Sequence, residues 1–596
     1  MDFNALVHTS IADTTGSLAP FAPELILCLT LMGLLLIRMI PFGDRIDAGF
    51  LAILGVAGAL YVAGPWSTLM ATPEQGVELF GGMIVFDSFT VGVRAILLVF
   101  TILFILFTKF SGMPAKEDGT DFYCLILGAI VGMCLMVSAN HLLMVFLAVE
   151  MASVPSYALA GIRRGHRLGS EAALKYSIYG AGAAGVMLYG ISLLAGLVNA
   201  VHLPTIAVEL STRLPEMSRP ELVVLILASM MIMAGLAFKL SAVPFHFWCP
   251  DVFEGATAEI AAFLSIASKA AALALLVRVC LGVGMLGPER ITAADLPPVI
   301  EAVDETEDED ADMASLPSST AVGMFAVDDD VATHADEGHD DAAHDDAADS
   351  GDVDASSPLS SVRLFLGIMV TVIASVTCTF GNLAAYGQTN IKRLFGYSTI
   401  AHAGYMMMPV PAALAVATVS PDSARDAISS IVLYVAIYMF MNLGAFAIIA
   451  FLRSTMNTEE ILDYAGMIKR APVLVVCFTL IMVSLIGIPP LAGFVGKFAV
   501  FASLADTYVV TGQTHLIVLL IVGGINTAIS LFYYLRVVKV MVIDPESDAI
   551  STYDGNIMGA LQLAFVVGIT VPVCLLIVNW NQLAGWSAAA AQQLFG

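Results

Sequence analysis

The sequence predicts an all-α polytopic membrane protein with about 14 transmembrane helices. Of its 596 residues, 58% are hydrophobic and only 13% are charged, and the mean hydropathy is +0.87. Apolar runs of roughly 20 residues, the length that crosses a bilayer, recur along the chain. Loops rich in Lys and Arg alternate with loops that are poor in them, as expected when successive loops face opposite sides of a membrane.

Fourteen apolar runs are long enough to span the bilayer. They lie at 23–40, 48–66, 88–108, 121–139, 142–161, 171–197, 221–249, 258–282, 363–385, 394–416, 427–452, 472–506, 515–542 and 559–580. An even number of spans puts both termini on one side. Loops after odd-numbered runs hold fourteen Lys and Arg residues and the other loops hold five. The positive-inside rule therefore predicts both termini outside, in the periplasm of a bacterial inner membrane. The first twenty residues show no basic region typical of a signal peptide.

One acidic segment accounts for most of the net charge of −26, because residues 301–354 hold 20 Asp and Glu and no Lys or Arg. Such a composition predicts that 283–362 is a disordered insertion on the outer side. His334, His339 and His344 within it lack the compact spacing of a metal site. The eight cysteines form no CxxC pair. We therefore expect no cluster, structural zinc or other cofactor.

A lysine and a helix break lie together in the seventh run, in "GLAFKLSAVPFHFWCP" (235–250). A charge such as that of Lys239 costs about 3 kcal/mol in hydrocarbon, and desolvation favours the neutral amine, which suits a proton carrier. Pro244 interrupts the helix and frees backbone groups that protein or water must satisfy. The alternative is a structural lysine that caps the freed carbonyl groups.

A second break lies in the twelfth run, where Pro489 and Pro490 precede Lys497 in "GIPPLAGFVGKF". Two broken helices five helices apart predict two inverted five-helix repeats, helices four to eight and nine to thirteen. The lysine precedes the proline in the first repeat and follows it in the second. The predicted segments are 1–120 (three helices), 121–282 (first repeat), 283–362 (insertion), 363–542 (second repeat) and 543–596 (C-terminal helix and tail).

Further polar residues lie inside other runs. Glu150 in the fifth helix and Lys175 in the sixth are predicted to form an ion pair whose opening releases a proton; a static structural pair is the alternative. Lys269 lies near the middle of the eighth helix among small residues, and His402 lies in the tenth. With Lys239 and Lys497, these residues would form a polar axis across the bundle. Arg94 and Arg278 are expected to be structural and to pair with a local acid such as Asp87.

Four segments carry a family resemblance. "FKLSAVPFHFWCPDVFEGA", "EAALKYSIYGA", "YSTIAHAGYMM" and "GIPPLAGFVGKF", with Glu150 upstream, resemble the antiporter-like membrane subunits of proton-pumping NADH:quinone oxidoreductase, complex I. The first motif looks most like that of subunit N, the homologue of mitochondrial NADH dehydrogenase subunit 2. The long acidic insertion departs from the family pattern.

The resemblance implies proton translocation driven by quinone reduction elsewhere in the complex. Glu150 and Lys175 would be the paired charges, Lys239 and Lys269 the central carriers, and Lys497 the residue that exchanges protons with the outside. The implied partners are the other membrane-arm subunits and the lipid bilayer, and indirectly the NADH-oxidising and quinone-binding subunits, with no nucleic acid. The subunit would hold no redox centre of its own. Two rival hypotheses are a subunit of a multi-subunit cation/proton antiporter or membrane-bound hydrogenase, and a scaffold that does not pump.

Overall fold

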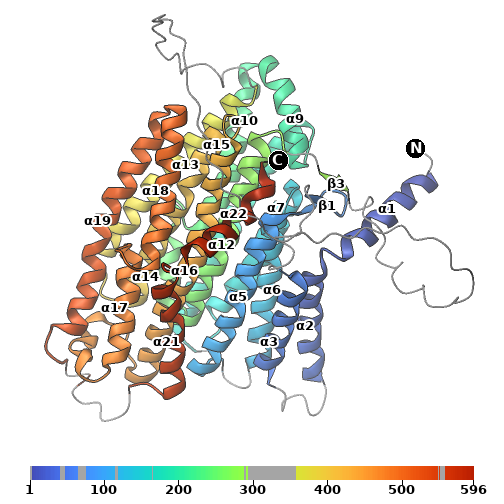
Figure 1. Ribbon diagram of the computed structural model, residues 1–596. Helices are drawn as coiled ribbons and strands as arrows, with labels where there is room; N and C mark the ends of the chain where they lie inside the picture. The colour runs from blue at the N-terminus through green and yellow to red at the C-terminus, as the bar shows by residue number, and fades with distance from the viewer. Residues whose placement is uncertain are drawn as a thin grey trace, which may run out of the picture.

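Long helices make up nearly all of the computed structural model (Figure 1). The structure describes residues 3–39, 47–64, 76–114, 118–163, 165–287, 290–292, 358–547, 550 and 557–595. Most of the predicted insertion, with its three histidines, lies outside these residues.

The helices, in chain order, are α1 (Phe3–Leu18), α2 (Ala22–Met39), α3 (Ala48–Ala63), α5 (Ser88–Ser111), α6 (Gly119–Ser138), α7 (Leu142–Ala160), α8 (Arg167–Val198), α9 (Leu203–Arg213), α10 (Arg219–Leu240), α11 (Trp248–Gly255), α12 (Ala258–Gly284), α13 (Ser360–Ala385), α14 (Ile391–Met407), α15 (Pro409–Val416), α16 (Pro421–Met456), α17 (Pro472–Ile486), α18 (Ala492–Thr511), α19 (Thr514–Val542), α21 (Ala560–Leu575) and α22 (Trp580–Ala591). Side-chain caps open several of them, since the Asp87 carboxylate accepts from the Thr90 amide and Asn390 accepts from the Lys392 and Arg393 amides.

The predicted membrane fold is confirmed. Within the described residues, 12 helical spans are long and apolar enough to cross a membrane, or 13 if α21 and the segment Trp580–Leu594, bent by 86°, form one span. The shorter apolar helix α3 occupies the second predicted run. Every one of the fourteen predicted runs coincides with one helix or with two consecutive helices. The reason is that polar backbone groups within the apolar membrane must form hydrogen bonds with one another.

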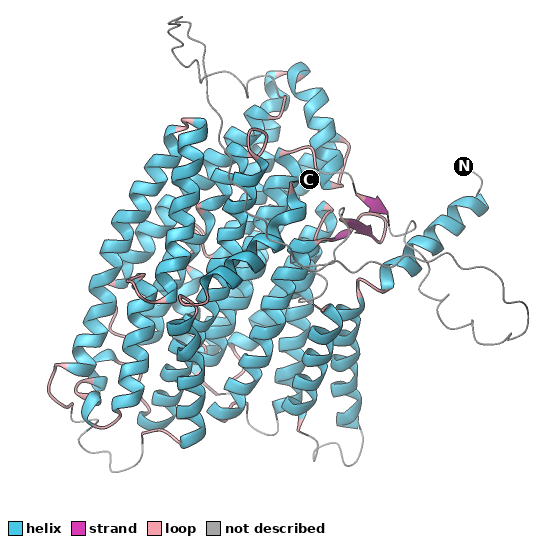
Figure 2. Cartoon of the chain, viewed as in Figure 1, coloured by secondary structure: helices cyan, strands magenta, loops and turns pink. Residues whose placement is uncertain are grey.

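Four elements were not predicted. They are α1, α9, the C-terminal α22 and a small sheet (Figure 2). In that sheet, β1 (Val77–Leu79) pairs antiparallel with β2 (Ile84–Phe86) and parallel with β3 (Ile291–Thr292). Among the described residues, the regular structure is therefore helical except for three short strands. The periodicity of long apolar runs does not report such short polar elements.

The two ends of the bundle differ. Figure 1 shows α1, the C-terminus and β3 at one end, which we call the sheet end. The opposite end, which we call the basic end, carries the loops with Arg163, Lys469 and Arg470. Both termini thus lie on the same side of the bundle, as an even number of spans requires.

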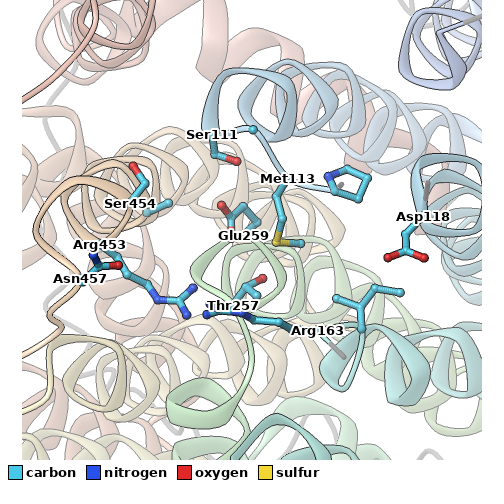
Figure 3. A pocket seen from close by; sticks show the side chains of 13 residues that line it. Ser111, Met113, Asp118, Arg163, Thr257, Glu259, Arg453, Ser454 and Asn457 are labelled. Atoms are coloured by element: carbon cyan, nitrogen blue, oxygen red, sulfur yellow. The ribbon is translucent and has the colours of Figure 1, made fainter. Parts of the chain in front are cut away.

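A cavity of about 470 Å³ opens at the basic end (Figure 3). The ends of α5, α7 and α16 meet the beginnings of α6 and α12 there. Its polar lining residues include Ser111, Asp118, Arg163, Glu259 and Arg453.

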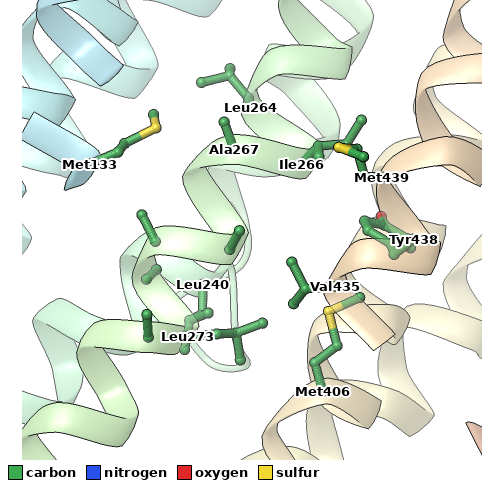
Figure 4. Close-up of a cluster of buried hydrophobic side chains, with 14 of the residues drawn as sticks. Met133, Leu240, Leu264, Ile266, Ala267, Leu273, Met406, Val435, Tyr438 and Met439 are labelled. Atoms are coloured by element: carbon green, nitrogen blue, oxygen red, sulfur yellow. The ribbon is translucent and has the colours of Figure 1, made fainter. Parts of the chain in front are cut away.

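Apolar side chains fill the centre of the bundle between α12 and α16. Figure 4 shows Leu240, Ile266 and Leu273 beside Val435 and Tyr438, and all five are at most 5% exposed. Charged side chains that reach this centre are therefore surrounded by apolar side chains.

Two matched helix crossings support the predicted repeat. An added Cβ at Gly132 of α6 would lie 2.5 Å from the Ala152 nitrogen of α7, and one at Gly381 of α13 would lie 2.5 Å from the Ala401 nitrogen of α14. Ala152 of the first repeat and Ala401 of the second are therefore equivalent positions. The residues that follow them, Ser153 and His402, correspond to each other in the same way.

Replacing Gly132 with valine is expected to lower the melting temperature, because α6 and α7 cannot approach each other with a side chain between them. Overpacking of this kind costs about 1–3 kcal/mol. Thermal unfolding of the purified protein measures the effect. Gly182→Val on α8 is the matched control, since nothing lies within 4 Å of its added Cβ. Equal melting temperatures for both variants would contradict the close crossing.

Candidate functional site

Both predicted helix breaks are present. The seventh span divides into α10 and α11, with Pro244 in the connecting segment, and the twelfth divides into α17 and α18, with Pro489 and Pro490 between them. The last turn of each leading half-helix ends in the left-handed backbone region, at Ser241 (φ 56°) and Gly487 (φ 89°). Such an ending leaves carbonyl groups without helical partners in the interior.

A lysine from outside each leading half-helix binds its freed carbonyl group. Lys269 Nζ of α12 donates to the Leu240 carbonyl oxygen at 2.5 Å and also to Ser241 Oγ. Lys497 Nζ of α18 donates to the Ile486 carbonyl oxygen at 2.9 Å. Lys269 and Lys497 thus make the same contact at the two breaks, although Lys269 lies on the eighth span and Lys497 on the second half of the twelfth. Lys239, which lies on the opposite side of its proline from Lys497, does not make this contact.

Lys239 does not make the carbonyl contact of the structural alternative. Its amine donates to Ser153 Oγ of α7 at 3.0 Å and not to a carbonyl of the break. The residue is 2% exposed. Glu150 lies one turn before Ser153, on the same face of α7. The Glu150 side chain is half-buried and has no hydrogen bond or ion pair with the described residues. Glu150, Ser153 and Lys239 therefore lie together at the end of α10.

The predicted ion pair between Glu150 and Lys175 is not formed. Lys175 Nζ lies 2.8 Å from Asp251 Oδ2 and 2.9 Å from Glu171 Oε1. Glu171 stands one turn earlier on α8, and the break in the seventh span brings Asp251 of α11 beside α8. Asp251 also pairs with Arg393 of α14 at 3.2 Å. Lys175 thus joins a half-exposed ion network that connects the two repeats.

His402 lies buried between two tyrosines. Its Nδ1 is 2.8 Å from Tyr434 Oη and its Nε2 is 3.1 Å from Tyr534 Oη. The Lys497 ammonium lies over the Tyr405 ring, 4.4 Å from its centroid, in cation–π contact. Tyr405 follows His402 by three residues on α14, so the structure brings His402 and Lys497 into one cluster.

A chain of hydrogen bonds that was not predicted from the sequence connects the two repeats. Asn442 Nδ2 lies 2.7 Å from Ser265 Oγ and 2.7 Å from Tyr438 Oη. Tyr438 Oη lies 3.3 Å from Thr399 Oγ1 of α14. Ser265 precedes Lys269 by one turn, and Thr399 precedes His402 by three residues. We call Ser265, Asn442, Tyr438 and Thr399 the polar bridge.

A signal for this bridge is visible in the sequence. Tyr434, Tyr438 and Asn442 recur every four residues in "YVAIYMFMN", and this spacing places them on one face of α16. Asn442 Oδ1 and the nearby Ser268 Oγ are buried and have no hydrogen-bond partner among the described residues. Both atoms can therefore bind a water molecule beside Lys269.

The two arginines outside the axis are structural, as predicted. Arg278 NH1 and NH2 each lie 2.5 Å from an Asp87 carboxylate oxygen. Arg94 pairs with Glu24 at 3.0 Å, an acid that the sequence analysis did not single out. Each of the four residues is at most 4% exposed. These pairs tie α12 and α2 to α5.

A second polar cluster lies at the sheet end. Glu78 of β1 lies 3.1 Å from His202 Nε2 and 3.7 Å from Arg290, and it accepts from Asn140 Nδ2 at 3.0 Å. Burial alone would raise the pKa of the Glu78 carboxyl, but His202, Arg290 and Asn140 hold it below its ordinary value. The Glu78 carboxylate is therefore charged at neutral pH, and its contacts hold the sheet against the beginnings of α7 and α9.

No group of three or more His, Cys, Asp and Glu residues able to hold a metal ion occurs among the described residues. The eight cysteines are free. The sequence prediction of no cofactor stays a prediction.

Comparisons with known proteins agree with this architecture. A profile of the NADH:quinone oxidoreductase/Mrp antiporter transmembrane family matches residues 139–288 and 353–529. NADH-quinone oxidoreductase subunit N of Anaeromyxobacter sp. is 33% identical over 589 residues, 97% of each chain. Subunit N of Desulfitobacterium hafniense is 31% identical over 584 residues, 97% of this chain and 99% of the relative.

Solved structures share the fold. A chain of respiratory complex I from Thermus thermophilus with bound aureothin superposes with a TM-score of 0.62 and 25% identity, covering 94% of this chain and 98% of the other. A chain of the Mrp complex from Dietzia sp. superposes with a TM-score of 0.69 and 16% identity, covering 97% of each, which shows likeness of fold alone. The chain therefore belongs to the NADH:quinone oxidoreductase/Mrp antiporter transmembrane family.

Proposed function

We propose that this chain is a proton-translocating membrane-arm subunit of an NADH:quinone oxidoreductase, complex I, in a bacterial inner membrane. Its direct partners are the other membrane-arm subunits and the surrounding lipid. NADH oxidation and quinone reduction take place on other subunits, and this subunit holds no redox centre. The basic end faces the cytoplasm, and the sheet end with both termini faces the periplasm, since basic loops remain inside.

The observation that carries this proposal is the line of buried amines and polar side chains through the bundle centre. Lys239, Lys269, His402 and Lys497 are each at most 3% exposed. Ionisable groups buried in membrane helices are costly and mark ion pathways. Two of the lysines bind carbonyl groups of broken helices, and the polar bridge connects the first repeat to the second. A scaffold that does not pump has no need for this arrangement.

The proton path follows this line. A signal from the neighbouring subunit changes the charges around Glu150 and the Lys175 network, and the amine of Lys239 then releases its proton. The proton passes to Lys269, across the polar bridge to His402, and on to Lys497, which releases it towards the periplasm. Each amine gains one proton and loses one per cycle. Crossing 100 mV costs about 2.3 kcal/mol per charge, which the energy released by quinone reduction on the other subunits must supply.

Replacing Lys239 or Lys497 with alanine in the assembled complex is expected to lower the number of protons pumped per NADH oxidised, because either change removes a carrier. Proton uptake and NADH oxidation by vesicles that contain the complex provide the measurement. Lys539→Ala, which removes a 60% exposed lysine that pairs with Asp544, is the matched control. Unchanged pumping with unchanged electron transfer in both test variants would sink the proposal.

A cation/proton antiporter subunit is the second candidate, because the chain shares its fold with the Mrp complex. Purification distinguishes the two. The proposed subunit is expected to co-purify with peripheral subunits that carry iron–sulfur clusters, whereas an antiporter subunit would be purified with membrane subunits only.

A further inference from the structure

One buried carboxylate faces the cavity at the basic end and takes no part in the axis described above. Glu259 is 6% exposed and lines the cavity of about 470 Å³. It makes no hydrogen bond or ion pair with the described residues, although buried carboxylates are normally paired. Figure 3 shows it among the lining side chains, with Asp118 and Arg453 farther out on either side.

The surroundings of Glu259 leave its carboxylate available to water in the cavity. Arg453 pairs with Glu459 at 2.8 Å. Lys392 donates to the backbone carbonyls of Glu254 and Ala256 at 2.8 and 2.7 Å and pairs with Glu459 at 2.9 Å. Both cations are thus hydrogen-bonded to other groups, and Glu259 acts on Lys392 only through space.

Glu259 lies at the N-terminus of the helix that carries Lys269. It is the second residue of α12, and its Thr257 cap accepts from the Ile260 amide. A carboxylate in the first turn of a helix interacts favourably with the helix dipole, so this charged side chain is compatible with the helix that it begins. The same helix carries Lys269 ten residues later, about 15 Å further into the bundle.

An apolar plug separates the cavity from the polar bridge. Phe446 of α16 is fully buried one turn from Asn442 and one turn from the cavity residue Ala450. Its ring packs against those of Phe253 and Phe395, with centroid distances of 5.9 and 5.4 Å. Glu259 and Ser265 are about 9 Å apart along α12, a gap that two or three water molecules could bridge.

We propose that Glu259 is the proton-uptake residue of this subunit, which receives protons from the cytoplasm through the cavity and passes them past Phe446 to Ser265 and Lys269. In each cycle, a water molecule in the cavity gives one proton to the carboxylate, and the carboxyl group gives that proton inward. The inference rests on the proposed function, because it names the residue that supplies protons to the same axis.

The test compares Glu259→Ala and Glu259→Gln with Lys239→Ala in the assembled complex in vesicles. We expect both Glu259 variants to lower protons pumped per NADH as far as Lys239→Ala does. The Glu259→Ala, Lys239→Ala double variant should show no further loss, because both residues act in one path. Added formate, a carboxylate small enough to enter the cavity, should restore pumping to Glu259→Ala but not to Lys239→Ala. Asp118→Asn removes another carboxylate of the cavity wall and should pump normally.

The outcomes separate the two proposals. Normal pumping by Lys239→Ala would overturn the proposed function itself. A defective Lys239→Ala with normally pumping Glu259 variants would overturn only the uptake role, and so would a loss that formate does not reverse. If Glu259→Ala fails to assemble, the isosteric Glu259→Gln variant takes its place, and a second experiment blocks the cavity with a thiol reagent. Ser454→Cys, modified from the cytoplasmic side by a bulky impermeant thiol reagent, should then lose pumping that the parent protein keeps under the same treatment.

Discussion

Replacing Arg278 with leucine is expected to cost about 3–5 kcal/mol of stability, because it leaves the Asp87 carboxylate buried without its partner. The guanidinium donates to both carboxylate oxygens, to Thr90 Oγ1 at 2.8 Å and from Nε to the Val137 carbonyl at 2.9 Å. All of these contacts disappear together. Thermal unfolding of the purified complex measures the loss of stability, and the amount of this subunit that remains in the complex is measured beside it.

Two controls identify the cause. Arg278→Leu combined with Asp87→Asn removes both charges while the asparagine still caps α5, and it should recover most of the lost stability. Arg213→Leu breaks an exposed pair with Glu209, whose side chains are 46% and 36% exposed, and should cost less than about 1 kcal/mol. If the double variant were as unstable as Arg278→Leu alone, the buried charge would not be the cause.

Arg278 also shows what separates structural charges from transport charges in this chain. Arg278 donates four hydrogen bonds, two of them to the Asp87 carboxylate, so each charge of this buried pair has an opposite charge as its partner. Lys269 and Lys497, in contrast, bind neutral carbonyl oxygens. A neutral partner allows the amine to lose its proton without leaving a buried anion behind.

The spans and both breaks could be predicted from the sequence, because each depends on local chemistry. A run of apolar residues is helical in lipid, and proline removes one backbone hydrogen bond from it. Helices α7 and α21 nevertheless continue through Pro155 and Pro572, so a proline alone does not identify a break.

Partner choice was predicted less well. Lys175 pairs with Asp251 and not Glu150, and it is Lys269 that binds the carbonyl freed beside Lys239. Such partners depend on how helices distant in sequence cross, which periodicity does not fix.

Lys269 and Lys497 make the same contact from different places in the repeat. The sequence pattern suggested Lys239 and Lys497 as counterparts, since each lies next to its own break. By contact, Lys497 matches Lys269 instead, because both bind the last carbonyl of a leading half-helix. Their helices do not correspond, since Lys269 lies on the eighth span and Lys497 on the twelfth. Lys239 contacts Ser153, whose counterpart in the second repeat is His402.

Replacing Asn442 with leucine is expected to abolish pumping by this subunit while every lysine of the axis stays in place. Asn442 is the one side chain that contacts both Ser265 of the first repeat and Tyr438 of the second, and its Oδ1 has no hydrogen-bond partner among the described residues. Leucine has a similar volume but neither donates nor accepts, so the polar bridge would be interrupted. Protons pumped per NADH in vesicles provide the measurement.

Asn140→Leu is the matched control for this prediction. Asn140 is 3% exposed, its Nδ2 donates to Glu78 Oε1 at 3.0 Å, and its Oδ1 accepts from Arg290 at 2.9 Å, in the polar cluster of the sheet end. Each variant loses buried hydrogen bonds at about 0.5–1.5 kcal/mol apiece, so their losses of stability should be similar. Only Asn442→Leu should lose pumping. Because the lysines on both sides of the bridge remain, normal pumping by Asn442→Leu would mean that protons cross between the repeats elsewhere or leave from each repeat separately.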